Sequence, residues 1–499
     1  MGSLRILASV WCGWCLAASV AVAGPPDYAA RLAVEGVVAG LGDPLALGSL
    51  WQDADDLMAD LGLAPARADW PAPAPVPDFA PTGGAVVELV DLRLLLTQIA
   101  VQTGADDHLS LTRAQGDRAH KVILLRGGFV TLPQLLALAR GTPAEDFIAD
   151  TAGGLVFARP LAIWNDAGLH LDATDRLLLN RASGSFVANL GWLSLSGGTV
   201  AGSNGINMSE PAFRPFILTA GTGSLTAQGA ILQNLGFGET AVFGGVSVVN
   251  NGLRLPLFPS QMTGSTLTDV TTLSLVGTQG ATVSDNHLSG ATGAAILVSQ
   301  SQDALIAGNT LENLSGPQGI RITADSRNIA IVDNALTGGA RTGILIDQGS
   351  SAITVDHNII LSQLATGLTV SAGSCVWLRG NLITTSGGSG ITISDTGAVY
   401  LSDNAILFNG GAAVLIRDQS AQAFAHLAGN VLIGNREGLR GATPGVLVLD
   451  DNDLDGQLPR VFTGDLAPLM VDWLRDQRAG TVPATPVSAA APCAIQGQG

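Results

Sequence analysis

Short runs of alternating apolar and polar residues recur along the chain from about residue 160 onward. From residue 281 they form a repeat, in which an apolar alternation, a polar corner and a second alternation lead to an asparagine; GIRITADSRNIAIVDN (319–334) is one such unit. A repeat of this kind predicts one structural unit stacked many times. The marker residues have a period in the low twenties and are Asn286, Asn309, Asn334, Asn358, Asn381 and Asn404, continued more loosely by Asn430 and Asn452.

This period predicts an all-β solenoid, namely a right-handed parallel β-helix with one coil per period. It is too short for a propeller blade, and a leucine-rich repeat would need a helix or a longer leucine signature. Asparagine tolerates the left-handed backbone that a sharp corner needs, and stacked amides can bond from coil to coil. In the strand after each Gly-x corner, alternation predicts that Ile320 and Ile322 point inward while Arg321 and Thr323 point outward.

The segments before the repeat have different patterns. Residues 24–119 predict a helical and Pro-rich N-terminal region, with an extended linker at 64–84 and helical spacing over 87–102. Residues 120–160 predict a lead-in strand over 120–130 and then a helix that Thr131 caps. Residues 161–463 are predicted to form the β-helix itself.

The C-terminal segment predicts a helix over 464–480 and a disordered tail over 481–499. An open solenoid end has to be covered, so we expect small α-helical caps at both the N-terminal and the C-terminal end. The apolar positions of the C-terminal helix are Leu466, Leu469, Met470, Trp473 and Leu474.

The first 23 residues predict a secretory signal peptide, because an apolar run after Arg5 leads to a small-residue cleavage site at 21–23. No later stretch is long and apolar enough to span a bilayer. Two of the four cysteines lie in this leader. Of the others, Cys493 lies in the Pro/Ala-rich tail, so the sequence predicts no structural disulfide between it and Cys375.

Composition narrows the possible partners. The formal net charge is −17 and Lys121 is the single lysine, so a basic surface for nucleic acid is not expected. The six histidines do not cluster, and residues such as His357 are expected to decorate corners. Metal-ligand spacings, phosphate loops and nucleophile triads are not found, so we expect no metal and no cofactor. Outward hydroxyls and the charged Arg321, Asp347 and Arg417 suit a sugar ligand, although ordinary solvated positions remain the alternative for each one alone.

Several segments resemble the periplasmic mannuronan C5-epimerases of alginate biosynthesis over roughly residues 120–480. They are KVILLRGGFVTLPQL (121–135), GGLVFARPLAIWNDAGLHLD (153–172), RLLLNRASGSFVANLGWLSLSGGTVAG (176–202) and FRPFIL (213–218), together with the Asn repeat. The resemblance implies a right-handed β-helix in the periplasm that acts on polymer during export. The implied chemistry inverts C5 of mannuronate, which needs a neutralised carboxylate, a base and an acid.

The family's catalytic signature, Asp-Pro-His-Asp-Arg-Ser after a Gly-Ile corner, is missing. In an alignment on the corner at 319–320, the first Asp falls on Arg321, the His that acts as base falls on Thr323 and the Arg falls on Asp325; only Ser326 matches. One coil later, the family's carboxylate-binding Arg falls on Gln348. A threonine hydroxyl cannot serve as a base near neutral pH.

The resemblance leaves the function, and whether the protein is an enzyme, open. The first hypothesis is a protein that binds, shields or guides an alginate-like polymer, uronate-type or acetylated, during export alongside export-complex proteins, with epimerase activity lost. The second is an active poly(mannuronate) C5-epimerase or lyase with a rearranged site that uses Arg321 and Asp347. A third is a β-helix unrelated to uronates, such as a surface adhesin. No catalytic residue is assigned beyond the family positions, and the candidate substrate-binding residues are Arg214, Arg321, Thr323, Asp325, Asp347, Ser371 and Arg417.

Overall fold

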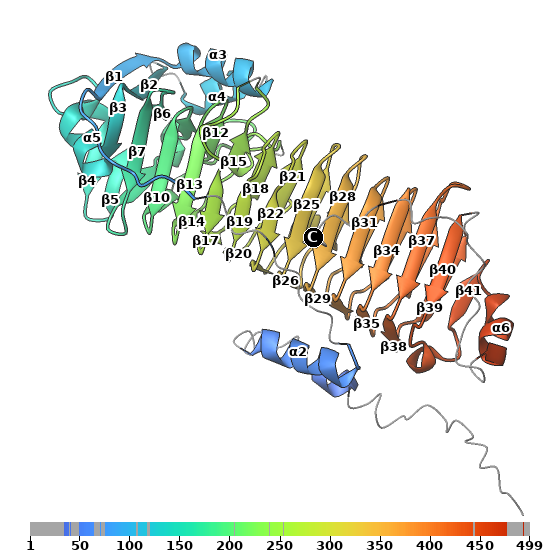
Figure 1. Cartoon of the computed structure of the whole chain (residues 1–499). Coiled ribbons are helices and arrows are strands. Elements are labelled where there is room, and N and C mark those ends of the chain that lie inside the picture. Colours follow the sequence, from blue (N-terminus) through green and yellow to red (C-terminus); the bar gives the residue numbers. More distant parts are fainter. Residues whose placement is uncertain are drawn as a thin grey trace, which may run out of the picture.

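A computed structural model describes residues 34–38, 40, 49–63, 70, 75–105, 108–116, 120–203, 205–238, 240–252, 254–442, 445–476 and 493. In this part of the chain the strands wind into a right-handed parallel β-helix of about 13 coils, which confirms the predicted all-β solenoid (Figure 1). The predicted signal peptide, parts of the linker at 64–84, residues 477–480 and the tail except Cys493 lie outside the described residues. None of the described helices is both long and apolar enough to cross a bilayer.

The coils build three parallel sheets, which we call A, B and C. Sheet A contains, in spatial order, β1 (Val86–Asp91), β2 (Lys121–Arg126), β6 (Leu161–Ile163), β9 (Val187–Asn189), β12 (Ile217–Ala220), β15 (Gly245–Val249), β18 (Thr272–Val276), β21 (Ile296–Ser299), β24 (Gln318–Thr323), β27 (Thr342–Ile346), β30 (Thr366–Ser371), β33 (Ile391–Ser394), β36 (Ala412–Arg417), β39 (Glu437–Ala442) and β41 (Phe462–Gly464).

Sheet B follows sheet A along each coil. Its strands are β3 (Gly128–Thr131), β7 (Ala167–Leu171), β10 (Trp192–Ser196), β13 (Ser224–Gln228), β16 (Gln261–Thr263), β19 (Thr282–Ser284), β22 (Leu305–Ala307), β25 (Arg327–Val332), β28 (Ser351–Asp356), β31 (Ser374–Arg379), β34 (Ala398–Ser402), β37 (Phe424–Ala428) and β40 (Val446–Asp450).

Sheet C completes each coil with mostly three-residue strands. They are β4 (Ile148–Thr151), β5 (Gly154–Phe157), β8 (Arg176–Leu179), β11 (Thr199–Gly202), β14 (Ile231–Gln233), β17 (Thr266–Thr268), β20 (His287–Ser289), β23 (Thr310–Glu312), β26 (Ala335–Thr337), β29 (Ile359–Leu361), β32 (Leu382–Thr384), β35 (Ala405–Leu407) and β38 (Val431–Ile433).

The β-helix begins earlier than the sequence suggested. β2, β3 and β5 already pair in parallel with β6, β7 and β8, so the first coil starts at Lys121 and the predicted boundary at 161 is wrong. The segment 120–130, predicted as one strand, turns a corner at Gly127 and contributes to two sheets. Only two pairs of neighbouring described strands are antiparallel, β1 with β2 and β4 with β5.

A continuous column of buried aliphatic side chains fills the solenoid along its length. Beside it the marker asparagines form a ladder: the Nδ2 of Asn334 donates to the Oδ1 of Asn358 at 2.9 Å, and Asn358 donates in the same way to Asn381 at 3.0 Å. Asn334 also donates to the carbonyl of Ile306 in the coil before. The predicted coil-to-coil amide bonding is therefore confirmed, and it satisfies backbone groups that the corners would otherwise leave unpaired.

The predicted left-handed backbone of these asparagines is wrong by one residue. The positive φ belongs to the residue before each ladder asparagine, for example Asp333 at 51° and His357 at 52°, whereas Asn334 and Asn358 are fully buried. The residue at the bend can point its side chain to solvent, while the next residue turns its amide into the ladder. One residue cannot both form the positive-φ bend and bury its amide in the ladder, so two neighbouring residues share these roles.

Two helices cover the outer face of sheet A at its N-terminal end, α3 (Leu92–Thr103) and α4 (His108–Ala114) (Figure 1). The predicted helix over 87–102 is wrong for its first five residues, which belong to β1 because they pair with β2. Nearby, α5 (Leu132–Ala139) begins at a capping box in which the Thr131 side chain accepts from the Gln134 backbone, as predicted.

Two further helices lie against other parts of the solenoid. α2 (Leu50–Asp60) packs Leu50, Leu57 and Met58 onto apolar outer residues of sheet C between β26 and β38. At the far end lies α6 (Leu469–Asp476), whose Trp473 is buried edge-on against Phe462. Of the positions predicted to be its apolar face, Leu469 and Leu474 are 38% and 47% exposed, and Leu466 precedes the helix.

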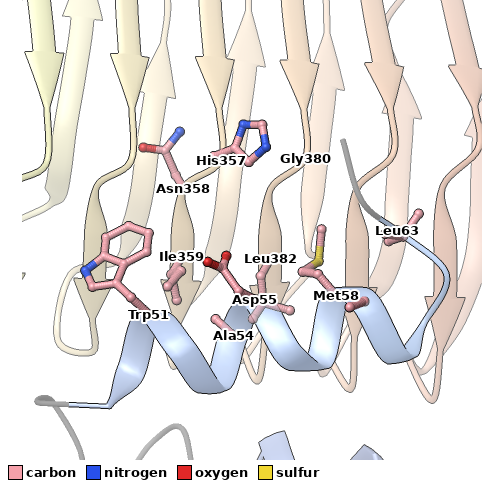
Figure 2. Close-up of a pocket in the computed structure, with 11 residues that line it drawn as sticks. Trp51, Ala54, Asp55, Met58, Leu63, His357, Asn358, Ile359, Gly380 and Leu382 are labelled. Carbon is pink, nitrogen blue, oxygen red and sulfur yellow. The ribbon is translucent and has the colours of Figure 1, made fainter. Parts of the chain in front are cut away.

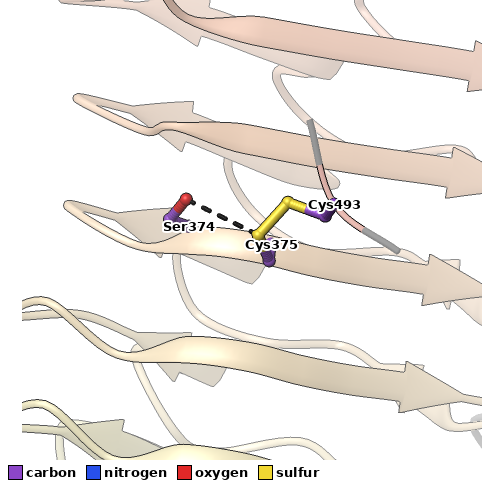
Figure 3. Close-up of a disulfide and its surroundings, with 3 residues drawn as sticks. All are labelled: Ser374, Cys375 and Cys493. Carbon is purple, nitrogen blue, oxygen red and sulfur yellow. Dashed lines mark hydrogen bonds between the residues drawn. A yellow bond between two sulfur atoms is a disulfide. The ribbon is translucent and has the colours of Figure 1, made fainter. Parts of the chain in front are cut away.

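The prediction that the mature chain has no structural disulfide is wrong. Cys375, at the start of β31, is bonded to Cys493, 118 residues later (Figure 3). The tail composition suggested an unstructured thiol, but a disulfide needs the folded chain to bring the two cysteines close together, and here their Cα atoms are 5.7 Å apart.

Candidate functional site

The outer face of sheet A is divided into a covered half and an open half. From β2 to β18 its outward residues, among them Leu218, Val249 and Val276, are buried beneath α3, α4 and a group of phenylalanines. From β21 to β36 no described element covers the face, and most outward side chains are partly exposed. We call this second region the open face; its outward residues are Leu297, Ser299, Arg321, Thr323, Leu345, Asp347, Thr369, Ser371, Thr392, Ser394, Leu415 and Arg417.

The register of the open face agrees with the sequence prediction. Its inward residues, such as Ile320 and Ile322, are fully buried in the core. Across neighbouring strands, Leu297 lies opposite Arg321, and Arg321 opposite Leu345. Since neighbouring strands are about 4.8 Å apart, the open face presents rows of outward side chains at that spacing.

The main charged feature of the open face is an ion pair between neighbouring coils. A terminal nitrogen of Arg321 donates to Oδ2 of Asp347 at 2.8 Å, and the side chains are 30% and 15% exposed. Among the described residues, the Arg321 Nε, the Asp347 Oδ1 and the Thr323 Oγ1 have no hydrogen-bond partner. All three atoms are buried, so their hydrogen-bonding capacity becomes available to a polar ligand only if neighbouring side chains move.

Ser326, the one residue that matches the family signature, has a corner role. It is fully buried, and its Oγ donates to the carbonyl of Thr323 at 2.7 Å. Asp325 and Gln348 lie at exposed corners with positive φ, where the Asp325 N–H donates to the Gln348 carbonyl at 2.9 Å. Both therefore lie at the edge of the open face, where sheet A turns toward sheet B.

Two other predicted residues lie farther along the open face. Ser371 ends β30 and is partly exposed. Arg417 ends β36, four strands from Arg321, with its Nε 3.7 Å from Asp418 in the same corner. That separation corresponds to roughly 19 Å, so a ligand touching both arginines would have to be an extended polymer.

The structure does not bring Arg214 to the open face. Its guanidinium donates to the backbone carbonyl of Asp269 and to the Oγ1 of Thr271, next to a cavity of about 500 Å³ on the side of sheet C that Arg181 also lines. Burial lowers the pKa of Arg214, and the charge of Arg181 adds to the effect. The FRPF motif instead places its two phenylalanines, Phe213 and Phe216, in the cover of sheet A.

All six histidines belong to the described part of the chain, and none lies on the open face. His170 and His426 are on sheet B, and His287 is on sheet C, with its Nε2 3.2 Å from Glu312. His287 and His426 thus lie in strands, contrary to the predicted corner positions, whereas His357 does lie at a corner. A base of the kind that the family uses is therefore absent from this face.

One buried imidazole–carboxylate pair occurs elsewhere, at the corner between sheets B and C. Asp356 is 1% exposed and bonds to the Nδ1 of His357 at 2.7 Å and to the guanidinium of Arg379 in the next coil. Burial by itself would raise the pKa of Asp356, but these two partners outweigh it and hold the pKa below its usual value. Figure 2 shows His357 at a cavity of about 240 Å³ beside Asp55 and Met58 of α2.

The contact between Asp356 and Arg379 could have been predicted from their places in the repeat. Asp356 and Arg379 each stand two residues before a ladder asparagine, so they occupy the same register in neighbouring coils. A second amide ladder at another corner was also missed: Asn409 donates to Asn435, which donates to Gln457.

Comparison with solved structures finds the same fold in the periplasmic alginate epimerase AlgG. It is 19% identical, with a TM-score of 0.64 over 77% of this chain and 99% of that chain. A variant of the same epimerase gives a TM-score of 0.67 at the same identity and coverage. The predicted resemblance to alginate epimerases is thereby confirmed for the fold.

Other comparisons add less. The A-module of the mannuronan C-5 epimerase AlgE6 from Azotobacter vinelandii is 12% identical and covers 70% of this chain and 95% of that chain, with a TM-score of 0.33. A family model described as periplasmic copper-binding protein (NosD) matches residues 259–449, which are the regular coils. No curated protein matches the sequence.

Proposed function

We propose that this protein is exported to the periplasm and binds an alginate-like polymer, uronate-type or acetylated, along the open face of sheet A without epimerising it. The proposal depends mainly on which residues occupy the position where the alginate epimerases that this chain resembles have their catalytic base. Here Arg321 is paired with Asp347 beside the Thr323 hydroxyl, and none of the histidines is on this face.

The open face is suited to hold a polymer by hydrogen bonds. Arg321 has N–H groups left over after its bond to Asp347, and a guanidinium is well matched to a sugar carboxylate. Farther along, Thr369 and Ser371 present partly exposed hydroxyls on β30, which suit sugar hydroxyls or acetyl groups; Ser394 lies opposite Ser371 on β33, where its hydroxyl donates to Asp418. A ladder of short polar side chains can therefore hold successive sugar residues in one direction.

The same residues are poorly suited to C5 inversion. Removing the C5 proton needs a base near the operating pH and neutralisation of the adjacent carboxylate. Thr323 provides no such base, and the Asp347 carboxylate is already engaged in a hydrogen bond from Arg321. The alternative, an active epimerase or lyase with a rearranged site, would have to use this pair.

Three observations support a periplasmic location for this protein. The first 23 residues have the pattern of a signal peptide, the Cys375–Cys493 disulfide fits an oxidising compartment, and the fold is that of an epimerase described as periplasmic.

We further infer that α5 and α6, whose Leu135 and Trp473 are buried in the core column, cap the two ends of the β-helix. Export-complex proteins are the expected partners.

The test combines binding with isotope exchange. Mature protein is incubated with hexamannuronate in deuterated buffer; we expect binding by titration calorimetry and no solvent deuterium at C5 by mass spectrometry. Because a hydrogen bond to a charged group contributes about 1.5–3 kcal/mol, Arg321→Ala should weaken binding at least tenfold. Arg327→Ala, which removes an exposed arginine from sheet B, is the matched control and should have no effect.

Two results would overturn the proposal. Deuterium at C5 would establish catalysis and favour the rearranged site. No measurable binding of hexamannuronate or of its acetylated form, or equal loss in both variants, would remove the open face as a polymer site.

A further inference from the structure

A further cavity lies on sheet B, on a different side of the solenoid from the open face. It measures about 500 Å³ and is bounded by the outward side of β7, β10, β13 and β16 and by residues 75–79 of the Pro-rich segment. We call residues 75–79 the strap. The strap crosses the strands rather than pairing with them, so it roofs the sheet without filling the space beneath it.

The strap is anchored by hydrogen bonds and by aromatic contacts. Shortly after the strap, Thr82 exchanges two bonds with Phe129: its N–H donates to the Phe129 carbonyl at 2.8 Å, and its Oγ1 accepts from the Phe129 N–H at 2.9 Å. The ring of Phe79 stacks on His170 at 5.0 Å and lies 4.9 Å from Trp192. Gly168 makes room for this packing, since a Cβ there would come within 2.7 Å of the Phe129 ring.

The floor of the cavity combines aromatic and hydrogen-bonding groups. The Trp192 Nε1 donates to the Thr226 Oγ1 at 2.9 Å, and the His170 Nδ1 lies 3.0 Å from the Ser194 Oγ. These bonds hold the indole and imidazole rings in place. Gln228 and Thr263, which lie side by side in neighbouring strands, add an amide and a hydroxyl at the open side.

This combination matches the chemistry of a sugar ring. A pyranose has apolar C–H faces that pack on aromatic rings, and an equatorial rim of hydroxyls that needs both donors and acceptors. Amide, hydroxyl and imidazole groups supply both. A purely apolar ligand would leave the Gln228 amide and the Thr263 hydroxyl without partners, at a cost in free energy.

The charges around the cavity distinguish it from the open face. No arginine or lysine is among its lining residues, and its titratable side chains are Asp78 and His170. Asp172 lies close enough to His170 to interact with it electrostatically. An anionic uronate would therefore meet carboxylates without a fixed counter-charge, whereas an uncharged sugar would not be repelled.

We propose that the cavity between the strap and sheet B is a second saccharide site, which binds an uncharged sugar residue, neutral or O-acetylated. It is independent of the open face and goes beyond the function proposed above. The aromatic groups of Phe79 and Trp192 provide the packing surface, and Gln228 and Thr263 provide hydrogen bonds to hydroxyl or acetyl oxygens.

The experiment uses the mature protein and four probes: cellohexaose, mannohexaose, O-acetylated mannohexaose and hexamannuronate. The double variant Gln228→Ala/Thr263→Ala removes two hydrogen-bonding groups of the cavity. Gln233→Ala/Thr268→Ala is a closely matched control, because those residues have the same types, lie in the same coils and are likewise paired in register, but on sheet C. Circular dichroism melting curves check that both variants fold.

We expect at least one uncharged hexamer to bind by titration calorimetry. Loss of two hydrogen bonds should weaken that binding about tenfold in the cavity variant, with a change of less than about twofold in the control. Arg321→Ala should leave the uncharged hexamer unaffected, which separates this site from the open face. The proposal fails if no uncharged probe binds, or if the two double variants behave alike.

Discussion

The two halves of the outer face of sheet A share one scaffold but have opposite surroundings. In both, aliphatic side chains point inward and are fully buried, so the core does not distinguish them. Their outward residues do. In the covered half these include Leu218, Val249 and Val276; in the open half they are mostly polar or charged, such as Thr369 and Ser371, with Leu297, Leu345 and Leu415 as the exceptions. Apolar surface gains roughly 25 cal/mol per Å² on burial, so the first set attracts a cover and the second set does not.

Sheet C follows the same rule with another cover. Where its outward residues are Ile359, Leu382 and Leu407, α2 lies on them. Where they are Thr266 or His287, no described helix covers the strands. Covered regions of the solenoid thus carry stability, and uncovered polar regions remain accessible to ligands. The predictions below test this division.

The largest effect is expected in the cover of sheet A. Phe216 is fully buried, stacked on Phe186 at 4.6 Å and 5.1 Å from Phe243. Phe216→Ala should lower the free energy of unfolding by about 3–5 kcal/mol, because it leaves a cavity as well as losing buried area. Denaturant unfolding followed by circular dichroism measures the change. Leu345→Ala on the open face should cost about 1 kcal/mol or less, and an equal loss in the two variants would contradict the division.

A smaller effect is expected where polar contacts rather than a cover tie neighbouring coils together. Asp356→Asn removes the carboxylate that Arg379 and His357 share, and should cost about 2–3 kcal/mol at pH 7; Arg379 is partly exposed, so the cost stays below that of a fully buried pair. The measurement is again denaturant unfolding, with Asp303→Asn at an exposed corner as the control.

The same variant has a pH signature. The folded-state pKa of Asp356 lies below its unfolded value of about 3.9, so the unfolded chain binds more protons as the pH falls through this range. The stability from the carboxylate is fully present above about pH 4 and is lost as the pH falls through the folded pKa. The gap between the wild type and Asp356→Asn should therefore narrow below pH 4; a constant gap down to pH 2 would contradict the ion-pair role.

The smallest changes in stability are expected when a polar residue of the open half and an apolar residue of the covered half are each replaced by the other type. Thr369→Val on the open face should change the free energy of unfolding by no more than about 0.5 kcal/mol, as is usual at a surface position, while weakening hexamannuronate binding a few-fold. Val249→Thr on the covered half should cost about 1–2 kcal/mol, since it buries a hydroxyl. Thermal melting compares the two, and the reverse order would show that outward residue type does not decide coverage.

The register of the coils could be predicted because it is a local property. Alternation between Ile320, Arg321, Ile322 and Thr323 assigns inside and outside without knowledge of any neighbour, and the asparagine period assigns the corners. The failures came where pairing is non-local. Residues 87–91 have helical spacing, yet they form β1 because β2 offers a partner thirty residues later in the chain. Propensity is a weak prior beside such pairing.

The candidate site residues also divide into those predictable from the local repeat and those placed by contacts between distant segments. Arg321 and Asp347 were assigned to one face, and they lie there because both occupy outward positions in neighbouring coils of sheet A. Arg214 was grouped with them through the FRPF motif, but the loop that carries it directs its guanidinium toward Asp269. The strap cavity was not predicted, since Phe79 and Trp192 meet only after the solenoid has wound.

By itself, the sequence determined the solenoid, its coil period, its asparagine ladder and which strand residues face solvent, because each depends on spacing of a few residues to one coil. Only the tertiary structure decided which solvent-side residues are covered, that Cys375 reaches Cys493, and that residues 75–79 roof part of sheet B. Those features join segments tens to hundreds of residues apart, and their free energy depends on complementary surfaces that no local pattern encodes.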